Sequence, residues 1–308
     1  MQYFERYKDL PTDAQKCVIV IGNFDGVHLG HQALLSRAKE KARALNVPLG
    51  VLTFEPHPRQ LFRSDEPPCR ITPSTLKRDR LSICGVDYVF SLPFDWDFAS
   101  QSATDFVQEI LIDGLNASHV FVGFDFKFGQ LRKGTPQTIT DAGLTVTVID
   151  EVKNEKHEGL SSSRIRQLLR HGKIEEANAV LGWNWKIGGV VVEGDKRGRE
   201  LGFPTANMKL DQTIHPAYGI YACYVQIEGE EDRLMGACNI GIRPMFEVPV
   251  AQVETFIFDF NREIYGQTVY VQPVKRLRGE AKFNSLDDLI TQMDKDCEQS
   301  RRLLENIA

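Results

Sequence analysis

Two histidines three residues apart, His28 and His31, are the clearest chemical signal in the sequence. They follow an apolar run at residues 17–21, which predicts a buried strand, and a turn that contains glycine. Where a helix begins, this spacing puts both rings on one face, and Gly30 between them leaves the backbone open to close approach. Unpaired backbone N–H groups point outward there, and neutral imidazoles add further donors. The stretch therefore predicts a phosphate-binding site.

Two loops that follow predicted strands add polar groups. Residues 53–58 hold His57 between two prolines, and on this pattern alone they predict a rigid turn as readily as a site. Residues 123–129 alternate three phenylalanines with polar residues, which fits either a half-buried edge strand or a binding loop. Asp125 lies between apolar neighbours and is expected to need a polar partner, which favours the binding loop.

A serine-rich helix start at residues 160–166 is a further signal for anion binding. Serine is a natural N-cap, so the simplest interpretation is a well-capped helix. Arg166 in the first turns, however, places a cation where the helix dipole is positive. A bound anion would resolve this conflict, which favours a site over a simple cap.

The second half of the chain holds a different polar stretch at residues 193–207. Glycines among basic residues predict a flexible loop with many donors, suited to a polyphosphate, although a surface hairpin would have the same composition. Thr205 and Asn207 offer hard oxygen ligands two residues apart, which suit Mg²⁺. Farther on, Glu254 lies in a predicted strand, where it is either a surface carboxylate or a general base.

The string GNFDGVHLGHQ at residues 22–32 resembles the HxGH signature of the nucleotidyltransferase superfamily, which is related to the HIGH motif of class I aminoacyl-tRNA synthetases. In this longer form it resembles the bacterial bifunctional riboflavin kinase/FMN adenylyltransferase family. The segments TFEPHP, GFDFKFG and LSSSRIR resemble motifs of the same family. The resemblance implies that His28 and His31 hold the ATP phosphates and stabilise charge on the leaving pyrophosphate.

The same resemblance implies further contacts in the adenylyltransferase half. For ATP, they are Gly22, Asn23, Phe24, Asp25, Gly30, Ser162, Ser163 and Arg166. For the flavin, they are His57, Asp125, Phe126 and Phe128.

Residues 193–207 resemble the riboflavin kinase signature GxxxGRxLGxPTAN. This match implies that Thr205 and Asn207 bind Mg²⁺ together with ATP, and that ATP is also contacted by Gly194, Lys196, Gly198, Arg199, Gly202 and Pro204. Residues 253–260 resemble the strand that carries the catalytic glutamate of the family, which implies that Glu254 takes the proton from the ribityl 5′-hydroxyl. The family has a flavin-facing arginine in its last helix, which implies that Arg301 contacts the flavin.

Three positions of the kinase half depart from the family pattern. Ile242 and Met245 stand where threonine is common, and Phe256 stands where histidine is common. These departures motivate an alternative in which the second half binds flavin as a sensor without catalysing phosphorylation. The intact Thr205 and Glu254 argue against it.

Alternating strand and helix patterns predict the elements that position the first set of residues. Apolar residues repeat at helical spacing over 32–45, and residues 48–54 predict a second buried strand, which completes a βαβ unit. The pattern continues through helices at 76–84 and 103–113 and strands at 87–90, 119–123 and 145–149. We expect an α/β fold with an open doubly wound parallel sheet, whose ligands bind beyond the carboxyl ends of the strands.

The second half is expected to be a small β-barrel with a terminal helix at 286–306. Five closely spaced strands predict it, because closure removes exposed edges. They are expected at 187–193, 218–228, 234–240, 252–260 and 268–274. The pattern changes near Trp183, so we expect two domains, residues 1–182 and residues 183–308.

The composition sets broader limits. A chain of 308 residues is long enough for two domains, and its net charge of −5 argues against a nucleic-acid-binding surface. No apolar run is long enough to span a bilayer, so a membrane is not an expected partner. The six cysteines are scattered without metal-like pairing, which predicts reduced thiols in a cytoplasmic protein.

The family resemblance implies a flavin-cofactor enzyme with riboflavin, FMN, FAD and ATP as its small-molecule ligands. The resemblance spans roughly residues 15–306 and implies that both halves are catalytic. An aminoacyl-tRNA synthetase relative would need a lysine-rich KMSKS-like loop and a basic surface, and neither is visible. Oligomeric state and protein partners are left open.

Overall fold

The computed structural model describes residues 1–155, 157–194, 198, 201–243 and 250–307. The chain forms two compact units. The first comprises Met1–Glu66 and Ser74–Ser161, and the second comprises Pro67–Pro73 and Ser162–Ala308. Residues 162–182 therefore group with the second unit, while the predicted boundary at residue 183 remains a prediction about independent folding.

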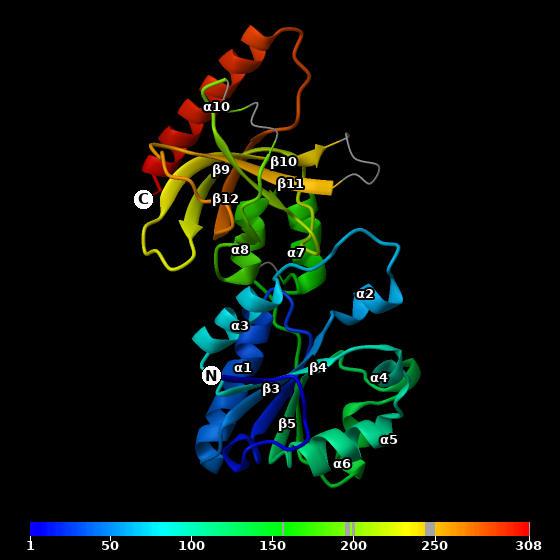
Figure 1. Ribbon diagram of the computed structural model, residues 1–308. Coiled ribbons are helices and arrows are strands. Elements are labelled where there is room, and N and C mark those ends of the chain that lie inside the picture. Colours follow the sequence, from blue (N-terminus) through cyan, green and yellow to red (C-terminus); the bar gives the residue numbers. More distant parts are fainter. Residues whose placement is uncertain (156, 195–197, 199–200, 244–249, 308) are drawn as a thin grey trace. The chain divides into compact units, whose positions relative to one another are not determined.

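The first unit contains the expected parallel sheet (Figure 1). Within the part of the chain that the structure describes, its strand order is β1-β4-β3-β2-β5-β6, and every pairing is parallel. The strands are β1 (Gln2–Phe4), β2 (Val18–Ile21), β3 (Leu49–Glu55), β4 (Tyr88–Pro93), β5 (His119–Gly123) and β6 (Val146–Ile149). The order reverses direction at β2, which lies between β3 and β5. This confirms the doubly wound fold.

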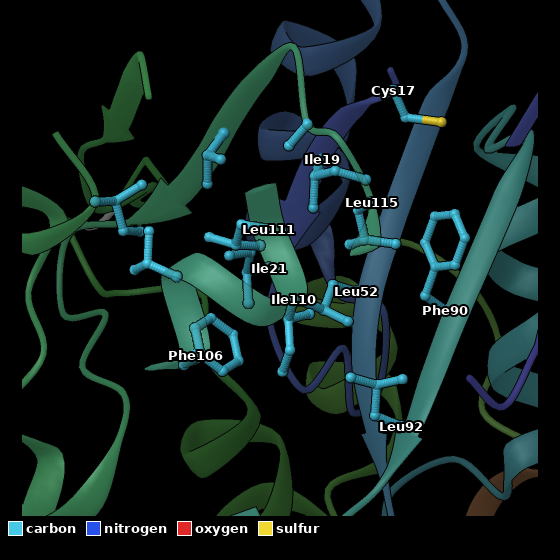
Figure 2. Close-up of a cluster of buried hydrophobic side chains, with 14 of the residues drawn as sticks. Cys17, Ile19, Ile21, Leu52, Phe90, Leu92, Phe106, Ile110, Leu111 and Leu115 are labelled. Carbon is cyan, nitrogen blue, oxygen red and sulfur yellow. The ribbon is translucent and has the colours of Figure 1, made fainter. Parts of the chain in front are cut away.

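Both faces of this sheet are covered, as a buried parallel sheet requires. Val18 and Val20 of β2 face α1 (Leu29–Leu45) and α3 (Ser74–Ile83). Ile19 and Ile21 face the opposite way. There they meet side chains of η2 (Phe106–Gly114), as Figure 2 shows. The alternation of β2 therefore places its carboxyl end between two packed layers.

Some elements of this unit differ from the expectation. The helix expected at 103–113 is a short α5 (Ala103–Asp105) followed by the π-helix η2, and β1 was not expected. The remaining short helices are η1 (Thr12–Ala14), α2 (Pro58–Phe62), α4 (Trp96–Ser100), η3 (Gln130–Arg132) and α6 (Pro136–Asp141).

The second unit contains the expected antiparallel barrel and terminal helix (Figure 1). Among the described residues its strand order is β7-β12-β9-β10-β11-β8. The strands are β7 (Ile187–Val190), β8 (Thr205–Lys209), β9 (Gly219–Ile227), β10 (Leu234–Arg243), β11 (Val250–Ile257) and β12 (Thr268–Arg278). A bridge between Val192 and Asn207 joins the two ends of this order and nearly closes the barrel. The strand β8 was missed, because its residues were expected to form a loop.

Among the residues that the structure describes, three helices and a short segment belong to the same unit as this barrel. The helices are α7 (Ser162–Arg170), α8 (Ile174–Leu181) and α10 (Leu286–Glu305). The segment 67–73 joins the unit through Trp185, which is fully buried and donates from Nε1 to the carbonyl of Ile71 at 2.8 Å. Ile214 also donates its backbone N–H to the carbonyl of Arg70. No local sequence pattern predicts this long-range arrangement.

Candidate active sites

The first candidate site lies at the carboxyl end of β2, where the strand order reverses. In doubly wound sheets, ligands bind at this reversal because the loops on either side diverge and leave a crevice. His28 is the N-cap of α1, and Leu29 is the first residue of the helix. The helix ends at Leu45, as the helical spacing over residues 32–45 predicted, and its C-cap Asn46 adopts a left-handed conformation.

The two histidines stack on each other, with ring centroids 3.7 Å apart and planes 24° apart. His28 Nδ1 accepts the backbone N–H of His31 at 3.4 Å, which leaves Nε2 as the ring nitrogen able to donate to a ligand. A Cβ at Gly30 would lie 2.9 Å from the Leu160 carbonyl oxygen and 3.1 Å from the His28 ring. Glycine is thus required between the histidines, and Nε2 of His28 is a donor beside the helix start.

The turn before the histidines is tightly held. Phe24 and Val27 have φ angles of 51° and 38°, which are unfavourable for side chains of their kind. Such conformations persist only where the surroundings fix them. Gln32 Nε2 donates to the Val27 carbonyl at 2.8 Å, and Thr53 Oγ1 donates to the Asn23 carbonyl at 3.2 Å. The structure therefore fixes the backbone that was predicted to bind phosphate.

The remaining predicted residues of the turn are buried or packed beside the histidines. Asp25 is buried, with 3% of its surface exposed, and Phe24 packs against His31 with ring centroids 4.9 Å apart. A Cβ at Gly22 would lie 3.2 Å from the Phe24 ring. These contacts connect the turn to the helix start as one local structure.

The residues predicted to bind flavin lie at the ends of β3 and β5. His57 caps α2 by accepting the backbone N–H of Arg59 at 3.1 Å. Phe126 and Phe128 stack with ring centroids 5.3 Å apart. Asp125 is exposed, so the expectation that apolar neighbours force a polar partner on it is wrong. A flavin contact of Asp125 remains a prediction.

The serine-rich helix start belongs to the second unit. Ser162 is the first residue of α7 and is half-buried, and Ser163 is exposed. Arg166 is buried and donates from Nε to the carbonyl of Cys69 at 2.7 Å. This carbonyl gives the guanidinium a structural partner, so the position of Arg166 does not require an anion. ATP contacts of these three residues remain predictions.

The second candidate site is a cavity of about 550 Å³ in the second unit. One row of side chains crosses its wall, because directly paired residues of neighbouring strands point to the same face. Asn207 of β8 pairs with Glu254 of β11, which pairs with Asn239 of β10. Asn239 pairs with Ile220 of β9, which pairs with Arg278 of β12. All five residues line the cavity.

The predicted magnesium ligands stand at one end of this row. Asn207 donates from Nδ2 to the carbonyl of Thr205 at 2.9 Å and to its Oγ1 at 3.4 Å, which fixes the orientation of the amide. A Cβ at Gly194 would lie 2.5 Å from Asn207 Nδ2, so glycine is needed for this approach. The cavity wall also includes Thr205, Gly194, Gly198 and Pro204.

The other predicted residues of the kinase half are placed differently. Gly202 has a φ of +87° and open space around it, and it is not among the residues that line the cavity. Lys196, Arg199 and Met245 lie outside the described residues. Ile242 is exposed, and Phe256 lines the cavity and packs edge-on against Phe203.

Arg301 does not line the described part of the cavity. Its guanidinium makes two hydrogen bonds, of 2.7 and 3.0 Å, to the carboxylate of Asp259, and this cation lowers the pKa of that carboxyl. Residues that the sequence did not single out do line it, above all Asn239 and Arg278. Asn239 begins residues 239–246, which resemble the kinase segment NxGxRPTF of the family. Arg278 lies in no such segment, and only the barrel register brings it to the row.

Comparisons with known proteins match both halves. The family model described as FAD synthetase matches residues 10–164, and that described as riboflavin kinase matches residues 181–304. A "Bifunctional riboflavin kinase/FMN adenylyltransferase" of Bacillus subtilis is 40% identical over 97% of this chain and 96% of its own length. The protein of the same name from Escherichia coli K12 is 39% identical over 91% of this chain and 90% of its own length.

The fold is also similar to that of a solved structure. A crystal structure of a protein named "Macrolide-efflux Protein" from Streptococcus pneumoniae has a TM-score of 0.84 and 35% identity, and the match covers 97% of this chain and 98% of that chain. In the described part of the present chain, no helix has the length and apolar character that a membrane span requires.

Proposed function

The chain belongs to the bifunctional riboflavin kinase/FMN adenylyltransferase family, and we propose that it carries out both reactions of that name. In the first, ATP phosphorylates riboflavin to give FMN and ADP. In the second, ATP adenylylates FMN to give FAD and pyrophosphate. The observation that carries the proposal most directly is the cavity wall on which Glu254 lies between Asn207 and Asn239.

The kinase step is assigned to this row. The Glu254 carboxylate would accept the proton of the ribityl 5′-hydroxyl while that oxygen attacks the γ-phosphorus and ADP leaves. The Thr205 hydroxyl and the Asn207 carbonyl oxygen are hard donors on one wall of the cavity, so they fit Mg²⁺, which is bound by few protein ligands together with substrate phosphates. When bound, Mg²⁺ neutralises charge on the phosphates.

The adenylyl step is assigned to the His28–His31 helix start. A phosphate oxygen of FMN attacks the α-phosphorus of ATP, and pyrophosphate leaves with increased negative charge. The imidazoles of His28 and His31 at the start of α1 are proposed to donate hydrogen bonds that stabilise this charge. His57, Asp125, Phe126 and Phe128 are proposed to bind the flavin at the neighbouring strand ends.

The sensor alternative differs from the proposed function in whether the protein forms FMN from riboflavin. Purified protein is incubated with riboflavin, ATP and Mg²⁺, and the flavins are separated by chromatography. We expect FMN first and FAD later, and FAD alone when FMN is supplied. A protein that makes FAD from FMN but no FMN from riboflavin would instead be an adenylyltransferase with a flavin-binding barrel.

We place the protein in the cytoplasm, in keeping with six cysteines that are free thiols in the described structure.

A further inference from the structure

We propose that Arg278 and Asp296 are positioning residues of the kinase site, which hold helix α10 against the barrel and thereby set the affinity for riboflavin. This inference rests on the proposed function of the cavity. Neither residue is assigned a role by the family motifs discussed above. The pair joins a polar wall of the cavity to a largely apolar one, and these walls are suited to different parts of riboflavin.

One wall is polar and the other is largely apolar. The polar wall is the cross-strand row with Asn207, Glu254 and Asn239. The opposite wall includes one stripe of α10, because residues three and four apart lie on the same helix face. Its members are Leu289, Met293, Asp296 and Cys297, and Ala281 and Phe283 of the preceding segment extend it. A flat aromatic ring fits the apolar wall, with its hydroxylated chain toward Glu254.

Asp296 is the one acidic residue on this stripe, and it is almost fully buried, with 4% of its surface exposed. Both oxygens of its carboxylate share the Nε–H of Arg278 at 3.1 Å, and one of them also accepts an N–H of a terminal nitrogen at 2.7 Å. Gln292, one turn earlier, donates to the same carboxylate at 2.9 Å. A buried pair with this many bonds fixes geometry more than it adds stability.

The sheet directs Arg278 toward this partner. The register of β12 against β9 shifts between Arg276 and Arg278, so that Arg278 pairs with Ile220 in the row that contains Glu254. Such irregularities re-aim side chains, and they are frequent next to active sites. The second terminal nitrogen of Arg278 donates to the Gly279 carbonyl at 3.0 Å, which fixes the guanidinium plane. Movement of α10 would therefore break several bonds at once.

A second pair on the same helix provides a matched control. Arg301 of α10 makes a bidentate pair with Asp259, which follows β11. Like Arg278–Asp296, this is an arginine–aspartate pair that ties α10 to the sheet. It differs in two respects: the Asp259 side chain is 76% exposed, and neither residue is among those that line the described cavity. A general effect of anchoring α10 would appear in both pairs, whereas a cavity-specific effect would appear only in Arg278–Asp296.

The test compares Asp296→Asn with Asp259→Asn in the full chain. Riboflavin affinity is measured by quenching of flavin fluorescence, and the KM and kcat of FMN formation are measured separately. For Asp296→Asn we expect a riboflavin Kd and KM raised about tenfold or more, with kcat within about threefold. For Asp259→Asn we expect changes below about twofold. FAD formation from FMN reports on the first unit and is expected to stay unchanged, while the retained kcat of FMN formation shows that the barrel is folded.

A double variant guards against misfolding. Arg278→Met with Asp296→Leu removes both charges and keeps apolar volume, so the protein is expected to stay folded but to keep the raised Kd. Equal effects at Asp296 and Asp259, or a loss of kcat with unchanged Kd and KM, would overturn the proposal. Failure of the proposed function is recognised separately, because then the unmodified protein forms no FMN, while its fluorescence titration still reports on the pair.

Discussion

The two candidate sites are built in opposite ways. In the first unit, the turn, the stacked histidines and the helix start come from one continuous stretch, and their main contacts are local. In the second unit, the five residues of the cavity row come from five strands spread over the barrel. A continuous motif is held by its own backbone, whereas a cross-strand row depends on the register of every pairing. Substitutions within its own segment should therefore lower the activity of the first site, whereas the activity of the second site should also be lowered by substitutions elsewhere in the barrel.

The largest effect should come from removing both histidines of the continuous site. We expect His28→Ala with His31→Ala to lower FAD formation from FMN by at least about 10³-fold, because each removes a donor to the developing charge. FMN formation from riboflavin should be unaffected. Both rates are measured by chromatography of the flavins.

A control separates chemistry from capping in this variant. His28→Asn keeps a side-chain acceptor for the backbone N–H of His31 but removes the ring. It should retain the thermal stability of the unmodified protein and still lose FAD formation. Unchanged FAD output in the double alanine variant would exclude the histidines from the site.

The next effect should come from the centre of the dispersed row. Glu254→Gln keeps the shape of the side chain and removes the base, so FMN formation should fall about 10²–10⁴-fold. Met245→Thr, which restores a hydroxyl common in the family, should change the rate by about tenfold at most. Comparable effects of the two changes would show that Glu254 is not the base. Steady-state rates with riboflavin as substrate decide between these outcomes.

The contrast between the sites also explains which parts of each site could be predicted from the sequence. The parallel sheet, the helix start and its two histidines were predicted because each follows from periodicity and spacing within one segment. Thr205, Asn207 and Glu254 were found through resemblance, yet their common row was not, since it requires the register of β8 and β11. The structural partner of Arg166, the carbonyl of Cys69, is nearly a hundred residues away in sequence. No local pattern predicts such a contact.

A smaller effect is expected on the stability of isolated barrel fragments that begin at different residues. From the domain boundary expected at residue 183, we predict that residues 183–308 fold alone and make FMN but no FAD. The backbone N–H of Trp185 donates to Asn178 Oδ1 at 2.9 Å, and residues 162–182 belong to the same compact unit. A fragment of residues 162–308 should therefore be more stable than one of residues 183–308, by about 1–3 kcal/mol in denaturant unfolding. Equal stabilities would support the boundary at residue 183.

The smallest effect is expected from one histidine in each unit, the buried His119 and the half-buried His215, and it tests whether the stability of both units depends on pH in the same way. Burial, followed by nearby Lys41, lowers the pKa of His119 below its usual 6.5, and burial, followed by Arg170, lowers the pKa of His215. The unfolded chain then binds more protons than the folded one near and below pH 6.5, so stability should fall as the pH drops through 6.5 toward the folded pKa. Above that range the histidines should contribute no pH dependence.

Thermal unfolding between pH 5 and 8 checks this expectation. His119 bonds from Nε2 to Thr147 Oγ1 at 2.8 Å, so His119→Gln keeps a polar partner and removes the titrating group. This variant should flatten the acid loss of stability for the first unit, and His215→Gln should do so for the second. FAD formation and FMN formation, followed during the same heating, identify which unit unfolds. If neither variant changes the slope, other groups cause the acid loss in both units.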